Sequence, residues 1–133
     1  ALEAAAAAEI SSVRGVYAAI SRTALRHGRT PNTEIYSAVL KNFHPKRSGE
    51  IFVVFEPNWF INDMEGLVVA STHGSPWNYD TFVPIIFAGA GLEHRVVDRL
   101  VHTVDIAPTL SGFVGVKQPS GTRGVPLVEV LEP

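Results

Sequence analysis

The sequence predicts an α/β fold, in which helices pack on a few mostly parallel strands. Three short runs rich in apolar and β-branched residues, at 51–55, 67–70 and 83–87, are typical of strands covered on both faces of a sheet. Apolar side chains recur at three- and four-residue steps over 35–43, which indicates a helix with one buried face. The 133 residues are 46% hydrophobic and 18% charged, so the chain is globular and suits a single domain over 1–133.

The N-terminal part predicts a helix, an ambiguous segment and a second, short helix. Residues 1–12 are rich in alanine, which has the highest helix propensity. The pattern over 14–20 fits a strand about as well as a helix. Residues 21–27 fit a short helix that ends at Gly28, because glycine is favoured just after a helix.

A longer helix is expected next, between a capped start and a proline. Asn32 or Thr33 can cap its first turn, and its apolar face extends to Phe43. Pro45 disfavours helical geometry at His44, so we expect the helix to end there.

The C-terminal part predicts one further helix between irregular segments. Residues 94–101 read as an exposed strand or a loop. A helix is expected to follow, with Thr103 or Asp105 as its N-cap and Gly115 as its stop. Residues 125–131 form a terminal apolar segment.

The loop over 71–82 gathers most of the polar groups that could carry chemistry. It joins two predicted strands, and binding groups concentrate on loops at strand ends. From the local pattern alone, His73 is either a surface or turn-stabilising histidine or a metal-binding or catalytic one. One histidine cannot hold a metal by itself, because a zinc site needs three or four ligands. Thr72 and Ser75 read as turn hydroxyls, since no base is paired with either.

Composition excludes several classes of function. The net charge is −2 and the positive residues are scattered, so the basic patch that nucleic-acid binding requires is missing. No apolar run approaches the roughly 20 residues that cross a bilayer. The chain has no cysteine, which excludes disulfides.

Three segments stand in the order found in one enzyme family. Residues 73–81, His-Gly-Ser-Pro-Trp-Asn-Tyr-Asp-Thr, precede a Val-Pro-hydrophobic run at 83–87. Residues 46–50 read Lys-Arg-Ser-Gly-Glu, and residues 103–110 contain Asp-Ile-Ala-Pro-Thr. Over 13–127 the chain thus resembles the alkaline phosphatase superfamily, most closely its type I phosphodiesterase/nucleotide pyrophosphatase-like branch. Residues 73–81 resemble the last metal-binding segment of that family.

The resemblance implies that the chain is the C-terminal segment of a larger α/β/α sandwich, the catalytic domain of a phosphatase or phosphodiesterase. In that family two divalent metal ions, usually zinc, bind the phosphoryl group and activate a Thr or Ser nucleophile. The match places His73 among the metal ligands. The nucleophile and the other ligands are expected N-terminal to this chain, so it should hold no catalytic residue and be inactive alone. The implied substrate is a phosphate ester or nucleotide-type small molecule, and the implied location is the periplasm or cell exterior.

Some residues near this segment keep two interpretations. Asp80 either orients the His73 ring or stabilises the turn. Trp59 lies in a region that approaches the substrate in the family, but we favour packing over the sheet edge. Phe82 stands where the family often has histidine, and Glu50 where aspartate is more usual. The remaining histidines match no ligand motif and read as structural: His27, His44, His94 and His102.

Two other functions compete with the hydrolase. The main alternative is a non-catalytic α/β interaction module that self-associates as a homodimer, because an unpaired sheet edge favours association. A sulfatase is a weaker hypothesis, since sulfatases share the Asp-Ile-Ala-Pro-Thr element.

Overall fold

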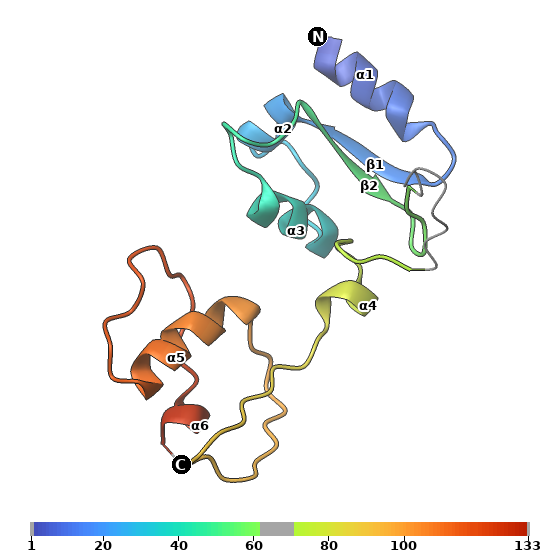
Figure 1. The fold of residues 1–133 in the computed structure, drawn as a ribbon. Coiled ribbons are helices and arrows are strands. Elements are labelled where there is room, and N and C mark those ends of the chain that lie inside the picture. Colours follow the sequence, from blue (N-terminus) through green and yellow to red (C-terminus); the bar gives the residue numbers. More distant parts are fainter. Residues whose placement is uncertain (1, 62–70, 133) are drawn as a thin grey trace. The chain divides into compact units, whose positions relative to one another are not determined.

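The structure, a computed structural model, describes residues 2–61 and 71–132. The chain divides into two compact units, Ala1–Val83 and Pro84–Pro133 (Figure 1). Its elements in chain order are α1 (Leu2–Ser11), β1 (Val16–Ser21), α2 (Arg22–Arg26), α3 (Glu34–Asn42), β2 (Ile51–Phe55), α4 (Asn78–Thr81), the 3-10 helix η1 (Thr103–Asp105), α5 (Ile106–Phe113) and α6 (Val128–Leu131). The predicted α/β class is confirmed. The single domain expected over 1–133 stays a prediction.

Strands β1 and β2 form a two-stranded antiparallel sheet, with Ala18 opposite Val54 and Ser21 opposite Ile51. The ambiguous segment at 14–20 is therefore a strand, and the strand at 51–55 is confirmed. The expectation of mostly parallel strands is wrong for this pair, because a buried apolar run shows that both faces are covered but does not fix the direction of its neighbour. The strand expected at 67–70 lies outside the described residues.

Helices cover both faces of this sheet. Figure 1 shows α1 along one side of the β1–β2 pair and α3 on the other. The core between α3 and the sheet contains Ala18, Ile20 and Val54 from the strands and Val39 from α3. Val39 and Val54 are each only 2% exposed. The first unit thus has the helix–sheet–helix layering that the resemblance implied.

The turn that leads into β2 is fixed by Arg22 at the start of α2. The Arg22 guanidinium donates to the Ser48 carbonyl oxygen at 3.1 Å, and the Arg22 amide donates to the Glu50 carbonyl oxygen at 2.7 Å. The Ser48 hydroxyl in turn accepts from the His44 amide at 2.9 Å. The Lys-Arg-Ser-Gly-Glu segment therefore sets where β2 begins.

In the second unit, hydrogen bonds to the side chains of Asp105 and Thr109 connect the start of α5 to the C-terminal segment. The Asp105 carboxylate accepts from the amides of His102 and Val125, each at 2.8 Å. The fully buried Thr109 hydroxyl donates to the Asp105 carbonyl oxygen at 2.6 Å and accepts from the Leu127 amide at 2.9 Å. Asp105 is the N-cap residue of α5, one of the two predicted, but its side chain makes no capping bond to α5 and instead accepts from the His102 amide at the start of η1.

The segment at 83–87 is not a strand, so the strand predicted there is wrong. Ile85 and Phe87 are half-buried while Ile86 is 82% exposed, so side chains alternate as they would in a strand. Within the described residues no neighbouring backbone forms a hydrogen-bonded ladder with this segment. Residues 94–101 also have no regular structure, so of the two predicted alternatives, exposed strand or loop, they form the loop. No helix in the described part of the chain has both the length and the apolar character needed to cross a membrane.

Candidate functional site

The loop that carries His73 ends in α4, and Trp77 attaches α4 to the end of the sheet. The Trp77 indole N–H donates to the Phe55 carbonyl oxygen at 3.0 Å, at the last residue of β2. The Tyr17 ring meets the Trp77 ring edge-on, with centroids 5.1 Å apart and an angle of 81° between the planes. Tyr17 is the extra residue of a β-bulge in β1, and a bulge re-aims the side chain that it carries.

A second contact holds α4 to the chain that leaves β2. The Tyr79 hydroxyl accepts from the Asn58 amide at 3.0 Å. Asn58 has a φ of +65°, a conformation that asparagine tolerates better than most residues. The one-turn helix α4 is therefore tied to the sheet by two aromatic side chains. The sequence indicated no helix here, because a single turn leaves no periodic pattern to detect.

Asp80 closes the His73 loop on itself. Its carboxylate accepts from the Ser75 amide at 2.8 Å, and the Ser75 hydroxyl accepts from the Trp77 amide at 3.4 Å. Hydrogen bonds from Ser75, with a smaller contribution from the nearby His73, lower the pKa of Asp80 below its ordinary value. Gly74, between His73 and Ser75, has a φ of +105°, which favours glycine. Asp80 therefore stabilises the turn, as one of its two predicted roles requires.

His73 lies on the exposed part of this loop, where its imidazole is open to solvent. His73 and Asp80 belong to the same closed loop, so the two predicted site residues are brought together. In the described ranges 2–61 and 71–132, no group of three or more His, Asp or Glu side chains is placed to hold a metal ion. One imidazole with one carboxylate is too few donors for a zinc site, so these residues alone do not fit a bound metal.

The Trp59 ring packs beside the start of β1. Its ring covers Gly15, where a Cβ atom would approach a ring carbon to 2.2 Å. The Arg14 guanidinium lies 5.5 Å from the centre of the same ring. The structure thus agrees with the favoured interpretation of Trp59, packing over the sheet edge. Phe82, where the family often has histidine, is 83% exposed.

An open groove of about 480 Å³ lies beside α4 in the first unit. Its aromatic walls are the rings of Tyr17, Trp77 and Tyr79, and Glu34 at the first turn of α3 is its charged residue. The sequence did not reveal this groove, because the three rings come from segments sixty residues apart. The bulge that exposes Tyr17 has no sequence signal of its own.

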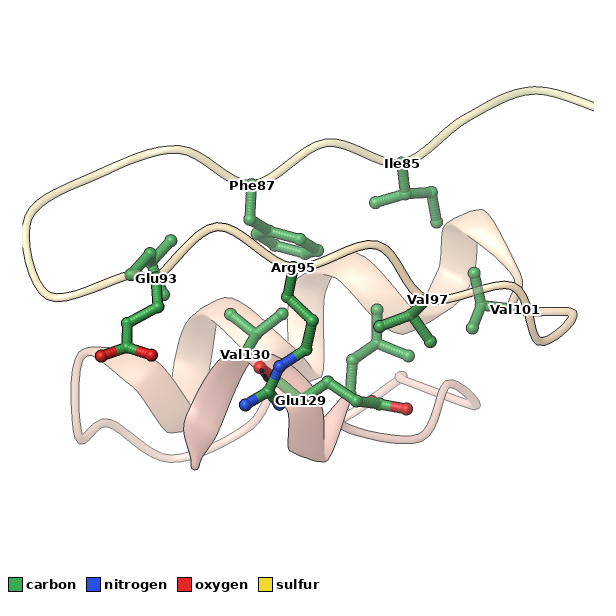
Figure 2. A pocket seen from close by; sticks show the side chains of 10 residues that line it. Ile85, Phe87, Glu93, Arg95, Val97, Val101, Glu129 and Val130 are labelled. Atoms are coloured by element: carbon green, nitrogen blue, oxygen red, sulfur yellow. Dashed lines mark hydrogen bonds between the residues drawn. The ribbon is translucent and has the colours of Figure 1, made fainter. Parts of the chain in front are cut away.

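A second, smaller hollow of about 160 Å³ lies in the second unit and holds none of the predicted site residues. Figure 2 shows Ile85 and Phe87 above it and Val130 beneath, with Arg95 across its middle. The Arg95 side chain donates to the Glu129 carbonyl oxygen at 3.4 Å. Its walls are mainly aliphatic, and the Glu129 carboxylate is paired with Arg99, so it offers no chemistry comparable to the His73 loop.

The chain is similar in sequence to several proteins named alkaline phosphatases. It is 37% identical over 95 residues to a Myroides odoratus protein named calcium-transporting ATPase, which covers 71% of this chain and 17% of that protein. It is 33% identical over 98 residues to the alkaline phosphatase PafA of Elizabethkingia meningoseptica, which covers 73% of this chain and 17% of that protein. Other relatives also carry the name alkaline phosphatase. No family model matches the chain.

A solved structure shows the same fold. The crystal structure of wild-type alkaline phosphatase PafA matches with a TM-score of 0.77 and 27% sequence identity, covering 98% of this chain and 24% of that one. The chain therefore spans about a fifth of the length of the curated relatives that it matches, from 17% to 20%.

Proposed function

The chain belongs to the alkaline phosphatase superfamily, and from this membership we propose that it forms part of a metal-dependent phosphoric-ester hydrolase to which His73 contributes one metal ligand. The observation that supports this most directly is the His73 loop, which Asp80 closes and Trp77 attaches to the end of β2. A metal ligand needs such a fixed backbone, because its ring must be held close to the geometry that the metal requires.

The alignments with relatives must include this loop. An alignment that spans 71% of a 133-residue chain necessarily crosses its middle, where His73 lies. The match to PafA spans 98% of the chain and so includes it too. Most of the relatives, and the solved structure, carry the name of a phosphatase, so we favour hydrolysis of a phosphate ester over the ion transport named for the Myroides protein.

The residues of this chain would have a positioning role in that reaction. His73 would present its imidazole from the loop, and Asp80 would keep the loop closed at neutral pH because its pKa is lowered and it stays ionised. When bound, a pair of divalent metal ions, which we propose to be zinc, would neutralise the charge of the phosphoryl group. The other ligands and the nucleophile would come from the part of the relatives that this chain does not span.

The substrate that we propose is a small phosphate ester, either a monoester or a nucleotide-type diester. The names of the relatives favour phosphatase activity, and parallel assays with p-nitrophenyl phosphate and bis-p-nitrophenyl phosphate would separate the two. A periplasmic or secreted location and self-association both stay predictions.

The contribution of Asp80 is tested by zinc titration of the protein that carries this chain. We expect Asp80→Asn to weaken zinc binding by roughly 10- to 100-fold, the usual effect of losing an outer group that supports a metal ligand, because the loop that carries His73 loses the bond that closes it. Asp98→Asn is the matched control, because Asp98 is an exposed carboxylate outside the loop. Equal affinities in both variants would remove Asp80 from the proposed site.

The chain of 133 residues taken alone provides a second test. We expect it to hydrolyse neither p-nitrophenyl phosphate nor the bis ester in the presence of zinc, because one histidine and one carboxylate cannot assemble the two-metal site. Turnover by the isolated chain, lost in His73→Ala, would show that the catalytic groups lie within it and would contradict the proposal.

A further inference from the structure

The groove beside α4 has the features of a site for a flat ring. Two of its rings are open to solvent, since Tyr17 is 42% exposed and Tyr79 is 54% exposed. Neither is free to turn away: Tyr17 is held edge-on against Trp77, and the Tyr79 hydroxyl is hydrogen-bonded to the Asn58 amide. Fixed, exposed aromatic rings stack well on planar ligands, because little side-chain entropy is lost on binding.

The charge on the groove selects among planar ligands. Glu34 is the one charged residue among those that line it, and its side chain is exposed. A carboxylate accepts hydrogen bonds but donates none, so it repels phosphate and attracts rings with N–H donors. The neighbouring Thr33 hydroxyl and Asn78 amide can both donate and accept. The groove is thus unsuited to the phosphoryl group and suited to a neutral ring.

We propose that this groove binds a nucleobase with adjacent N–H donors, of the guanine type, stacked on Tyr17 and Tyr79 and paired with Glu34. Asn78 and Tyr79 in the groove belong to α4, the same helical turn as Asp80, which closes the His73 loop. A base held here lies on the element that supports His73. The groove therefore selects the organic group of a nucleotide ester, and this link to the reaction rests on the proposed function.

The test measures binding of a base that carries no phosphate, so that it depends on neither metal nor turnover. The chain has two tryptophans, and Trp59→Phe leaves Trp77 as the remaining one, which reports on the groove by fluorescence. Guanosine, inosine and ribose are titrated into this variant. We expect saturable quenching by guanosine, weaker binding of inosine, which lacks the amino group, and none by ribose.

Two further substitutions identify the contacts. In the Trp59→Phe background, Glu34→Gln is expected to weaken guanosine binding by about fivefold, the value of one good hydrogen bond, and to abolish the preference over inosine. Glu9→Gln on α1, an exposed glutamate away from the groove, is expected to change nothing. Tyr17→Leu is expected to weaken guanosine and inosine alike, because it removes stacking and not pairing.

The outcomes separate this inference from the proposed function. No saturable quenching, or equal binding in Glu34→Gln and Glu9→Gln, overturns the nucleobase site. Guanosine binding in the expected order, combined with no zinc binding and no phosphate-ester hydrolysis by the protein that carries this chain, keeps the nucleobase site and refutes the hydrolase. Hydrolysis of phosphate esters without guanosine binding keeps the hydrolase and refutes the nucleobase site.

Discussion

In the His73 loop, hydrogen bonds favour the ionised form of the Asp80 carboxyl. Hydrogen bonds from Ser75 lower its pKa, and His73 adds a smaller effect in the same direction. The folded pKa lies below the unfolded one, so this contribution to stability is present above the unfolded pKa and is lost as the pH falls through the folded value.

The Ser75 amide reports this titration. In an NMR pH series, the Ser75 amide resonance should shift with a midpoint below the ordinary aspartate value of 3.8, because its acceptor is the Asp80 carboxylate. In Asp80→Asn the shift should vanish. A midpoint at or above 3.8 in the wild type would show that the loop is not closed as described.

Gly15 is required for two separate reasons, and two variants separate them. Its φ is +90°, and an added Cβ would overlap the Trp59 ring, whereas Gly28 has a φ of +61° with open space around it. Gly28→Ala should therefore lose only the backbone contribution, about 1 kcal/mol, and Gly15→Ala should lose roughly 1–3 kcal/mol from the backbone and more from displacing the ring. Urea denaturation of both variants tests this. Equal losses would mean that the Trp59 ring does not lie on Gly15.

Among the helices and strands, the sequence predicted those whose composition or hydrophobic period extends over enough residues to be recognised. The helices α1, α3 and α5 and the strand at 51–55 were expected where they occur, because each has enough residues to show a composition or a period. The residue pattern at 14–20 was ambiguous, the family resemblance favoured a strand, and the pairing with β2 confirms the strand. Pairing direction, the bulge at Tyr17 and the single turn of α4 depend on neighbours distant in sequence, so local patterns could not show them.

The attachment of α5 to the C-terminal segment gives a prediction at this scale. Thr109→Val removes the hydroxyl that accepts from the Leu127 amide and leaves that buried N–H without its acceptor. The expected loss is about 1–3 kcal/mol in the free energy of unfolding. Ser111→Ala is the control, because the Ser111 hydroxyl only donates to the Ala107 carbonyl oxygen within α5, and its loss should be under about 1 kcal/mol. Similar losses in both variants would contradict this role of Thr109.

For the whole molecule, an ion pair in the second unit predicts sensitivity to acid. Arg99 donates to the Glu129 carboxylate at 2.8 Å and lowers the pKa of Glu129 from its ordinary value of 4.5 to about 2. Because the folded pKa is the lower one, the pair stabilises the fold above pH 4.5, and this contribution is lost as the pH falls toward 2. Partial exposure of both side chains keeps the effect modest.

Denaturation midpoints between pH 5 and pH 2.5 test this pair. We expect Glu129→Gln to lower the midpoint at pH 5 and to flatten its decline toward pH 2.5, since the neutral amide does not titrate. The same decline in the variant and the wild type would assign the acid sensitivity to other carboxylates, such as Asp105, whose pKa is also lowered by its backbone donors.

The candidate site was predictable from the sequence in part. His73 and Asp80 were singled out from their loop, and the structure brings them together through the Asp80–Ser75 bond. The groove was not predictable, because Tyr17, Glu34 and Tyr79 meet only after β1, α3 and α4 have packed. We propose that the ligands that complete the metal site with His73 come from the part of the relatives that this chain does not span.

Metal analysis of the protein that carries this chain shows whether His73 is a metal ligand of a phosphoric-ester hydrolase. Wild type, His73→Ala and His94→Ala are compared, since His94 is an exposed histidine outside the loop. We expect His73→Ala to lose about one of two zinc equivalents and most of the phosphatase activity, while His94→Ala keeps both. Unchanged metal content and activity in His73→Ala would contradict this role of His73 and leave the family resemblance as one of fold alone.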